Sequence, residues 1–498
     1  MLNLHGLFAV LHSKYMKINK INSLVFAMLF GFGLSGQAQT KQWTLEECVR
    51  YALDNNITIK VSELDVENAE INKKDAFGRY LPSVNGNASH SWNIGLNQDV
   101  TTGVLRNQTT QYSSVGLSAG VDIYRGLQNQ NTYRRTKLAI IASQYQLLKM
   151  QEDVSLNVAN AFLQILGYKE DFKIKTEQLS IDEKRLKRSE EMVSAGTIPR
   201  GDLFDLKATI ATDKQNIAVS ENNLLISKLS LAQLLQLKEF ADFDVVDDTN
   251  AKDENNIMAQ SPIDIYNKAK ETRTELKLAQ TNLEIAEKNV AIAKGAYQPT
   301  LSAFYNFNTR ASYSDIISGR VIDPVNPTTQ IGYVQGTNQA VLTDNYSTVT
   351  GSAKPIFDQF NDNKGQSFGL QLSVPIFNGF SVRNNVERNK VSLEKSKIDL
   401  EQKSLDLQRN VYTAFTNAKA ALNTYEAATV TLEARQQAYN YAKEKYDVGL
   451  MNSFDFTQAQ TLLTNAQSDV IRTKYDYIFK IKILEFYFGI PIVPIPAK

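Results

Sequence analysis

The sequence predicts a mainly α-helical protein with a transmembrane β part, built from two copies of one architecture. The stretch from Gly126 to Gly196 recurs from Gly379 to Gly449 at a constant offset of 253 residues, without a gap. Each copy lacks proline, and 70 residues of helix would extend roughly 105 Å. Segments that alternate apolar and polar side chains precede each copy and are typical of half-exposed β-strands.

Two apolar series run along each long segment, and each series steps by seven residues. Such heptads indicate coiled-coil packing. The two series are two residues apart, about 200° around a helix, so each helix needs a neighbour on both sides. In the first copy Glu152 interrupts one series. A two-stranded coiled coil is the simpler alternative. In the second copy the series are Val386, Leu393, Leu400, Leu407, Ala414, Ala421 and Ala428, and Val391, Ile398, Leu405 and Tyr412.

The N-terminus resembles an export signal. Lys17 and Lys20 precede an apolar core at residues 24–34, which is followed by small residues up to Ala38. This order is that of a secretory signal peptide, and the core is too short for a membrane-spanning helix. We interpret residues 1–38 as a signal peptide whose true start is Met16.

The first structural repeat is predicted at residues 39–237. Thr44 begins a helix, and Glu47 completes a capping box there. Cys48, the only cysteine, is expected to be a small buried apolar group. Two strands follow at about 83–96 and 113–125, separated by a loop at 97–111. A helical hairpin at 127–237 turns at Gly196-Thr197-Ile198-Pro199.

The second repeat replays this order at residues 262–490, after an acidic connector at 238–261. Its strands are predicted at about 299–313 and 366–378, and its helical hairpin at 380–488. A segment at about 314–365, rich in glycine, asparagine, threonine and proline, separates the two strands. A loop of this length is usually functional or disordered. Residues 491–498 form a C-terminal tail.

Composition argues against several functional classes. The net charge of +1 offers no basic surface for nucleic acid. His90 is the only histidine beyond the signal segment, and no cysteine or histidine cluster has metal-ligand spacing. No glycine-rich phosphate loop or nucleophile elbow is present. We therefore expect no enzyme activity, no cofactor and no metal.

The number of strands predicts an oligomer. Four amphipathic strands cannot close a barrel, and lipid does not tolerate an open sheet edge. Bacterial barrels begin at about eight strands. Several chains must therefore contribute strands if these cross a membrane. Two chains give about eight strands and three give about twelve, and counting alone leaves both open.

The order and duplication of several short motifs resemble the TolC-like outer-membrane efflux protein family over nearly the whole mature chain. This resemblance implies a homotrimer with a 12-stranded outer-membrane barrel and a long periplasmic helical tunnel. It implies an exit duct for a tripartite efflux pump or type I secretion system, which works with a periplasmic adaptor and an inner-membrane transporter. The motifs are Leu45-Glu46-Glu47, Ala52-Leu53, Asn55-Asn56, the Tyr-x-Pro entries at Tyr80 and Tyr297, the corners 123–126 and 374–379, and the turn 446–449.

The resemblance also implies where a periplasmic gate lies. Asp455 matches a family aspartate that lines the constriction, and Gln458 takes the place of a second aspartate. Asp202 matches an aspartate that helps to hold the closed state, and Tyr446 matches one of its partners. Met451 replaces the arginine that is its other partner, and we consider Arg200 as a substitute.

The residues also have a reading that does not depend on the family. Asp202 and Asp205 are three residues apart on one face at a helix start, where carboxylates stabilise the helix dipole. A ring of Asp455 side chains would instead favour cations in a narrow pore. The resemblance, in turn, implies that the turns at Gly196-Thr197 and Gly449-Leu450 are the adaptor contacts.

The principal alternative is a secreted or periplasmic coiled-coil scaffold without a pore. The scaffold hypothesis explains the helical hairpins and the export signal as well as the duct hypothesis does. It does not explain the strands with alternating apolar and polar residues. Partitioning into the outer membrane would separate the two hypotheses.

Overall fold

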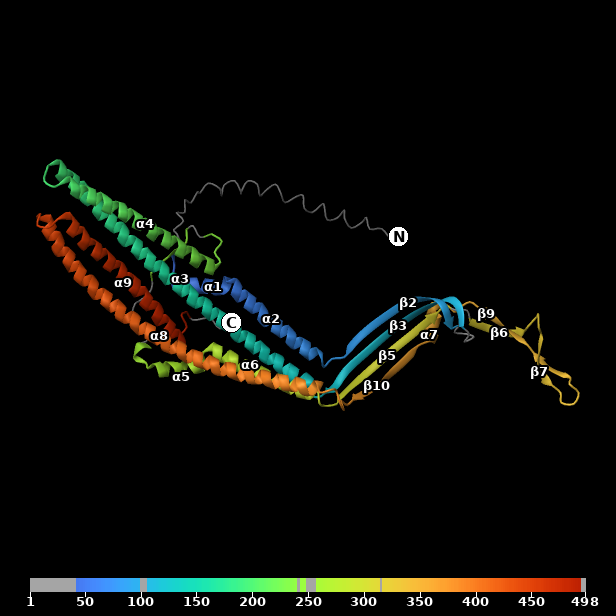
Figure 1. The fold of residues 1–498 in the computed structure, drawn as a ribbon. Coiled ribbons are helices and arrows are strands. Elements are labelled where there is room, and N and C mark those ends of the chain that lie inside the picture. The colour runs from blue at the N-terminus through green and yellow to red at the C-terminus, as the bar shows by residue number, and fades with distance from the viewer. Residues whose placement is uncertain (1–41, 99–104, 240–241, 248–256, 314–315, 494–498) are drawn as a thin grey trace, which may run out of the picture.

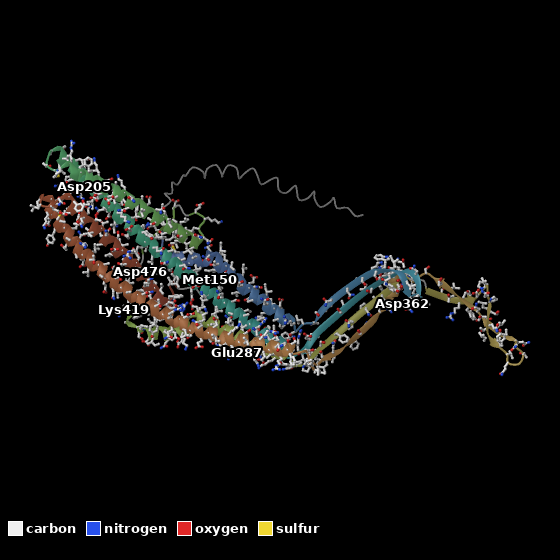
Figure 2. The ribbon with its side chains drawn as sticks, in the orientation of Figure 1. Met150, Asp205, Glu287, Asp362, Lys419 and Asp476 are labelled. Carbon is white, nitrogen blue, oxygen red and sulfur yellow. The ribbon has the colours of Figure 1, made fainter. Side chains whose placement is uncertain are left out.

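The computed structural model describes residues 42–98, 105–239, 242–247, 257–313 and 316–493. The signal segment predicted at 1–38, including Met16, lies outside these residues. The molecule is elongated: its helices gather at one end and its long strands at the other, as Figure 1 shows. Asp205 and Asp362, labelled in Figure 2, lie close to these opposite ends.

Two long helical hairpins repeat each other with identical helix lengths. In the first, α3 (Gln128–Ser194) is followed by α4 (Arg200–Leu235). In the second, α8 (Ser381–Asp447) is followed by α9 (Ser453–Phe488). The long helices have 67 residues each and the return helices 36, all related by the offset of 253. The predicted internal duplication of helical hairpins is confirmed.

Shorter helices precede each pair of strands. They are α1 (Leu45–Asn55) and α2 (Ile57–Gly78), repeated as α5 (Pro262–Thr272) and α6 (Thr274–Gly295) at an offset of 217 residues. The difference between the two offsets, 36 residues, is the extra chain between the strands of the second repeat. The capping box is confirmed, because Thr44 Oγ1 accepts from the Glu47 amide and Glu47 Oε2 accepts from the Thr44 amide.

The four long strands form one antiparallel sheet in the order β10-β5-β3-β2. They are β2 (Ser83–Gln98), β3 (Leu105–Arg125), β5 (Thr300–Ser312) and β10 (Gly365–Ser373). Cross-strand partners such as Leu117 and Phe307, or Ala303 and Leu370, point to the same face. The alternating apolar side chains of the strands therefore share one face, and glycine, serine and asparagine dominate the other.

Two strand boundaries were wrong. The loop expected at 97–111 is largely strand, because β2 continues to Gln98 and β3 begins at Leu105, and β2 pairs with β3 along its full length. The strand expected at 366–378 ends earlier, at Ser373. Pro375 follows and has no amide to donate to β5.

The segment at 314–365 is structured rather than an irregular loop where it is described. Strands β6 (Ile316–Ile322) and β9 (Tyr346–Gly351) form one hairpin ladder, and β7 (Thr328–Tyr333) and β8 (Ala340–Asp344) form another beyond it. A short helix, α7 (Ile356–Asp362), returns the chain to the sheet. The hairpins extend away from the helices, past the end of the main sheet (Figure 1).

The chain has two apolar cores, one centred on each repeat, and α9 contributes to both. In the first, buried Cys48 and Val49 of α1 pack with Val158 and Phe162 of α3 and with Leu231 of α4. In the second, α5 packs on α8 and α9 at the equivalent positions Val411 and Leu484. Cys48 is a buried apolar residue, as expected. The connector contributes β4 (Asp244–Val245), which pairs in parallel with β1 (Gln42–Trp43), and a 3-10 turn, η1 (Ile257–Ala259).

Candidate functional site at the ends of the helical hairpins

The two hairpins turn with the same backbone geometry. Gly196 and Gly449 both adopt the left-handed region, with φ of 73° and 78°. The amides of Thr197 and Leu450 reach back to the carbonyls five residues earlier, at 2.9 and 2.8 Å. This is a Schellman ending, which satisfies the last helix carbonyls and needs glycine. All four turn residues are exposed, so both turns present backbone and side chains to solvent.

The acidic gate candidates occupy equivalent places in the two repeats. Asp202 lies in the first turn of α4 and Asp455 in the first turn of α9, 253 residues later. Asp205 and Gln458 are likewise equivalent, and both are exposed. Asp455 is exposed, whereas Asp202 is half-buried. The duplication thus places two helix starts, each with an aspartate in its first turn, at the same end of the elongated molecule.

The two helix starts differ in how they are capped. Asn452 accepts from the Asp455 amide at 2.8 Å and donates to its carboxylate at 2.8 Å. The equivalent residue in the first repeat is Pro199, and no side chain caps α4. Helix-start stabilisation therefore accounts for part of the role of Asp455.

Tyr446 takes part in an aromatic contact within its own hairpin. Its ring stacks on Phe456 of α9 with centroids 4.7 Å apart and planes 11° apart. The guanidinium of Arg185, from α3, lies 4.5 Å from the Phe456 ring centroid and 5.5 Å from that of Tyr446. Arg185 thus connects the two hairpins at this end, as does Arg188, which donates to Asp447 of α8 at 3.4 Å. The exposed Arg200 lies in the first turn of α4.

A buried polar cluster lies next to this arginine, between α3, α4 and α9. Asp182 is fully buried and accepts hydrogen bonds from Arg185 at 2.8 Å and from Gln178 at 2.6 Å. Gln460 of α9 donates to both Asp182 oxygens at 3.1 Å, and its own oxygen accepts from Arg185 at 2.6 Å. Charge-assisted bonds of this kind are stronger than neutral ones and fix one geometry.

Asp213 of α4 faces the same cluster. Burial and the neighbouring Asp182 carboxyl raise its pKa to about 7, although Arg185 opposes the shift. A second negative charge is unfavourable beside Asp182 in this partly buried site, so Asp213 keeps its proton up to near neutral pH. Asp213 also lines a polar cavity of about 80 Å³ with residues of all three helices, including Asn216 and Thr461.

A second polar layer lies further along the same three helices. Asp171 of α3 accepts from Ser220 of α4 at 2.7 Å and from Ser468 of α9 at 2.8 Å. Burial would raise the pKa of Asp171, but hydrogen bonds from Lys175 and these two serines outweigh it and lower the pKa. Layers of this kind hold the α9 hairpin on the α3–α4 hairpin by directional bonds as well as apolar packing.

Sequence reasoning missed both polar layers, although one signal was available. One apolar heptad series of α3 contains Ile140, Leu147, Val154 and Ala161, and three further steps of seven reach Asp182. A carboxylate at a core position of a heptad requires partners, because an unpaired buried charge is strongly unfavourable.

Comparison with known families matches this duplicated architecture. The model of a family described as outer membrane efflux protein matches residues 49–236 and 265–481, which are the greater part of the chain. The chain belongs to the outer membrane efflux protein family. The gap between the matched segments contains the acidic connector, and the two segments correspond to the two structural repeats.

Several solved structures share the fold at low sequence identity. The channel protein CusC is 17% identical with a TM-score of 0.70, and the match covers 89% of this chain and 91% of that one. The CmeC outer membrane channel of Campylobacter jejuni is 18% identical with a TM-score of 0.66, covering 89% and 85%. The outer membrane protein VceC of Vibrio cholerae is 13% identical with a TM-score of 0.66, covering 89% and 96%. Comparison with curated proteins returns no match.

Membership of this family places the protein in the outer membrane. The shared fold also confirms the predicted fold class for the single chain. Within the described ranges, no helix is long and apolar enough to cross a membrane. The described residues also contain no group of three or more histidine, cysteine, aspartate or glutamate side chains placed to hold a metal ion.

Proposed function

We propose that three copies of this chain form the outer-membrane exit duct of a tripartite efflux pump or type I secretion system. The duct conducts substrates passively from a periplasmic adaptor and an inner-membrane transporter to the cell exterior. The observation that carries the proposal is the sheet, whose four strands have an apolar face, a polar face and two unpaired edges, β10 and β2.

An amphipathic sheet with open edges is stable in lipid only when it closes with other copies. Three copies supply twelve strands, with the apolar face toward lipid and the polar face toward a pore. The family resemblance favours three copies over two.

The long helices support the same assembly. Val391, Ile398, Leu405 and Tyr412 form one face of α8, and all four are exposed in the single chain. Lipid cannot cover this face if the helices continue from the barrel into the periplasm. A neighbouring copy of the chain is therefore the occupant that a helical tube supplies.

The hairpin ends form the periplasmic entrance in this proposal. Asp202 and Asp455 from each copy form acidic rings that favour cations at the narrow end, and Asp205, Gln458 and Tyr446 surround them. The exposed turns at Gly196-Thr197 and Gly449-Leu450 contact the adaptor.

Single-channel conductance in a planar bilayer tests this function, with the oligomer verified by native mass spectrometry. Wild-type protein is expected to give discrete, cation-selective steps. Asp455→Asn and Asp202→Asn each remove one charge per copy, and together they are expected to abolish most of the selectivity. Asp399→Asn, on the exposed surface of α8, is the matched control that removes the same charge away from the hairpin ends.

The outcomes separate the parts of the proposal. Steps whose selectivity does not change in the double variant would keep the duct and reject the acidic rings. A folded protein that never inserts or conducts would favour the coiled-coil scaffold instead.

A further inference from the structure

The second repeat carries a structural element that the first lacks. Residues 316–351, called the arm below, form the two stacked hairpins β6/β9 and β7/β8. Among the described residues the first repeat has no counterpart, because β2 and β3 pair with each other up to Gln98 and Leu105 at the equivalent position. Among the described elements, these strands pair closely only with each other and lie outside the main sheet.

Hydrogen bonds order the end of the sheet from which the arm leaves and the junction between its two hairpins. At its base, Gln359 of α7 exchanges two hydrogen bonds with the backbone of Ser312, at 2.9 and 3.0 Å. At the junction of the hairpins, Asn345 donates its amide to Pro327 at 2.9 Å and its side chain to Asn326 at 2.9 Å. Asp323 donates its amide to the Asn345 carbonyl at 2.7 Å. The arm therefore has a specified shape.

The surface of the arm is unusually apolar for a free projection. Only Arg320, Asp323 and Asp344 are charged among its 36 residues, against 21% charged residues in the whole chain. A single two-stranded hairpin is marginally stable in water at best, and large exposed apolar patches mark interaction sites. The exposed large apolar residues of the arm are Val321, Ile322, Val325, Ile331, Tyr333, Val334, Val341, Leu342, Tyr346 and Val349.

These residues are distributed over both faces of the β6/β9 hairpin. Ile322 is paired with Tyr346, so the two lie on one face, while Val321 and Val349 lie on the other. A single partner protein on one side would cover only half of them. Two neighbours, one on each side, would cover both faces.

The position of the arm in the sheet indicates that these two neighbours are other copies of the chain. It leaves the sheet between β5 and the edge strand β10, beside the seam where a second copy must pair. Strand β5 has 13 residues, slightly more than the 9–11 that span a bilayer, so the arm begins where the span ends and lipid does not reach it. In a ring of copies, each arm has an identical arm on either side, at a high effective concentration.

We propose that the arms of the three copies pack against one another at the outer mouth of the duct and form a collar around its exit. One face of each β6/β9 hairpin covers the opposite face of the next, as a rotationally symmetric ring requires. The few charges and the two apolar faces fit a second copy of this chain better than a charged ligand or a one-sided partner. This inference depends on the proposed trimer.

Thiol chemistry in lipid nanodiscs tests the collar. Cys48 is buried, so a cysteine added to the surface is the thiol that a charged maleimide reaches. Tyr346→Cys and Val349→Cys probe the two faces, and Asp358→Cys on the exposed surface of α7 is the matched control. In trimers verified by native mass spectrometry, both face variants are expected to react roughly tenfold or more slowly than the control.

Mild oxidation gives the positive counterpart. The double variant Tyr346→Cys/Val349→Cys is expected to form covalent dimers and trimers, because its two thiols lie on opposite faces and meet only between copies. Each single variant is expected to form few. Verified trimers whose face cysteines react as fast as the control and do not crosslink would overturn the collar and leave the duct intact. A protein that is monomeric by mass would instead refute the proposed assembly itself.

Discussion

The helices α3 and α8 have the same length and the same heptad positions, but they have different neighbours within the chain. Leu138, Tyr145, Glu152 and Ala159 of α3 are half-buried or buried, since α2, α4, α6 and α9 all pack on this helix. The equivalent residues of α8, Val391, Ile398, Leu405 and Tyr412, are all exposed. One helix is thus interior to the chain, and the other forms its edge.

This difference shows how one duplicated pattern serves two purposes. The interior helix has its second face covered by its own chain and can carry the half-buried charge of Glu152 there, and it buries the charge of Asp182 on its other stripe. The edge helix keeps apolar residues at the same positions, with Leu405 in place of Glu152. Charges with fixed partners specify packing inside the chain, whereas an apolar stripe remains available for another copy.

The largest expected effect comes from placing charges in the stripe of α8. Ile398→Lys with Leu405→Lys is expected to convert the trimer to monomers, because an unpaired buried ammonium costs several kcal/mol and each interface would contain two. Native mass spectrometry reports the oligomer. Asp399→Lys, one position from the stripe on an already charged and exposed residue, is expected to leave the trimer intact. A trimer that tolerates both lysines would show that α8 is not an interface.

The next effect concerns the buried charge that distinguishes α3. Arg273, 4% exposed, pairs with Glu152 at 2.9 Å and Glu275 at 3.0 Å and lies 3.8 Å from the Phe486 ring centroid. Arg273→Met leaves the half-buried Glu152 without its cation, with the Thr274 hydroxyl still bonded to it, and is expected to lower the free energy of unfolding by about 3 kcal/mol. Thermal unfolding followed by circular dichroism measures the loss.

Two variants control this result. Arg409→Met removes an exposed ion pair with Asp406 and is expected to change stability by less than about 1 kcal/mol. Glu152→Leu gives α3 the residue that α8 carries, and in combination with Arg273→Met it is expected to recover most of the lost stability. Equal losses in the single and double variants would mean that the pair is not coupled.

A smaller effect distinguishes the polar cluster of the first repeat, which the second lacks because Ala466 replaces Asp213. The pKa of Asp213 is raised to about 7 in the folded protein, by burial and by Asp182, whereas an unfolded aspartate titrates near 4. The folded state then binds more protons between these values, so stability falls as pH rises from about 4 to about 7.

Asp213→Asn is expected to remove this fall and to raise stability at pH 8 by on the order of 1 kcal/mol, since Asp213 is only partly buried. Unfolding followed from pH 5 to pH 8 measures it. Asp205→Asn, an exposed aspartate on the same helix, should keep the wild-type slope. A slope unchanged in Asp213→Asn would assign the proton to another group.

The fold could be predicted from the sequence because its main features follow from an internal repeat and from the periodicity of apolar residues. The offset of 253 residues, the turn glycines and the alternating strands each have one simple structural solution. The polar clusters were not predictable in the same way. Arg185, Asp213 and Gln460 are far apart in the chain, and each looks like a surface residue of an amphipathic helix until packing brings them together.

The sequence also could not predict which faces of the long helices are covered within the chain and which are exposed. Both long helices showed stripes on opposite sides, and only the packing of α2 and α6 against α3 shows which stripe is filled within the chain. Likewise, composition alone did not predict that residues 316–351 form paired strands, because the strands are short and turn residues such as Pro324, Pro327 and Gly336 lie between them.

The smallest expected effect concerns the two helix starts at the hairpin ends. Asn452 caps α9 through its bond to the Asp455 amide, and Pro199 leaves α4 without a side-chain cap. Asn452→Ala is expected to destabilise the first turn of α9 by about 1 kcal/mol, which increases amide exchange there. Hydrogen exchange with mass spectrometry detects this locally.

The first repeat supplies the control for this cap. Pro199→Ala changes the equivalent residue without removing a cap, so exchange in the first turn of α4 should rise much less. If Asn452→Ala raises exchange at α9 and also alters cation selectivity, Asp455 depends on its cap for its position at the entrance. If exchange rises and selectivity does not change, the effect of the Asp455 carboxylate on permeating ions does not depend on the Asn452 cap. Either result separates the structural role of Asp455 from its proposed electrostatic one, which Asp202 carries without a cap.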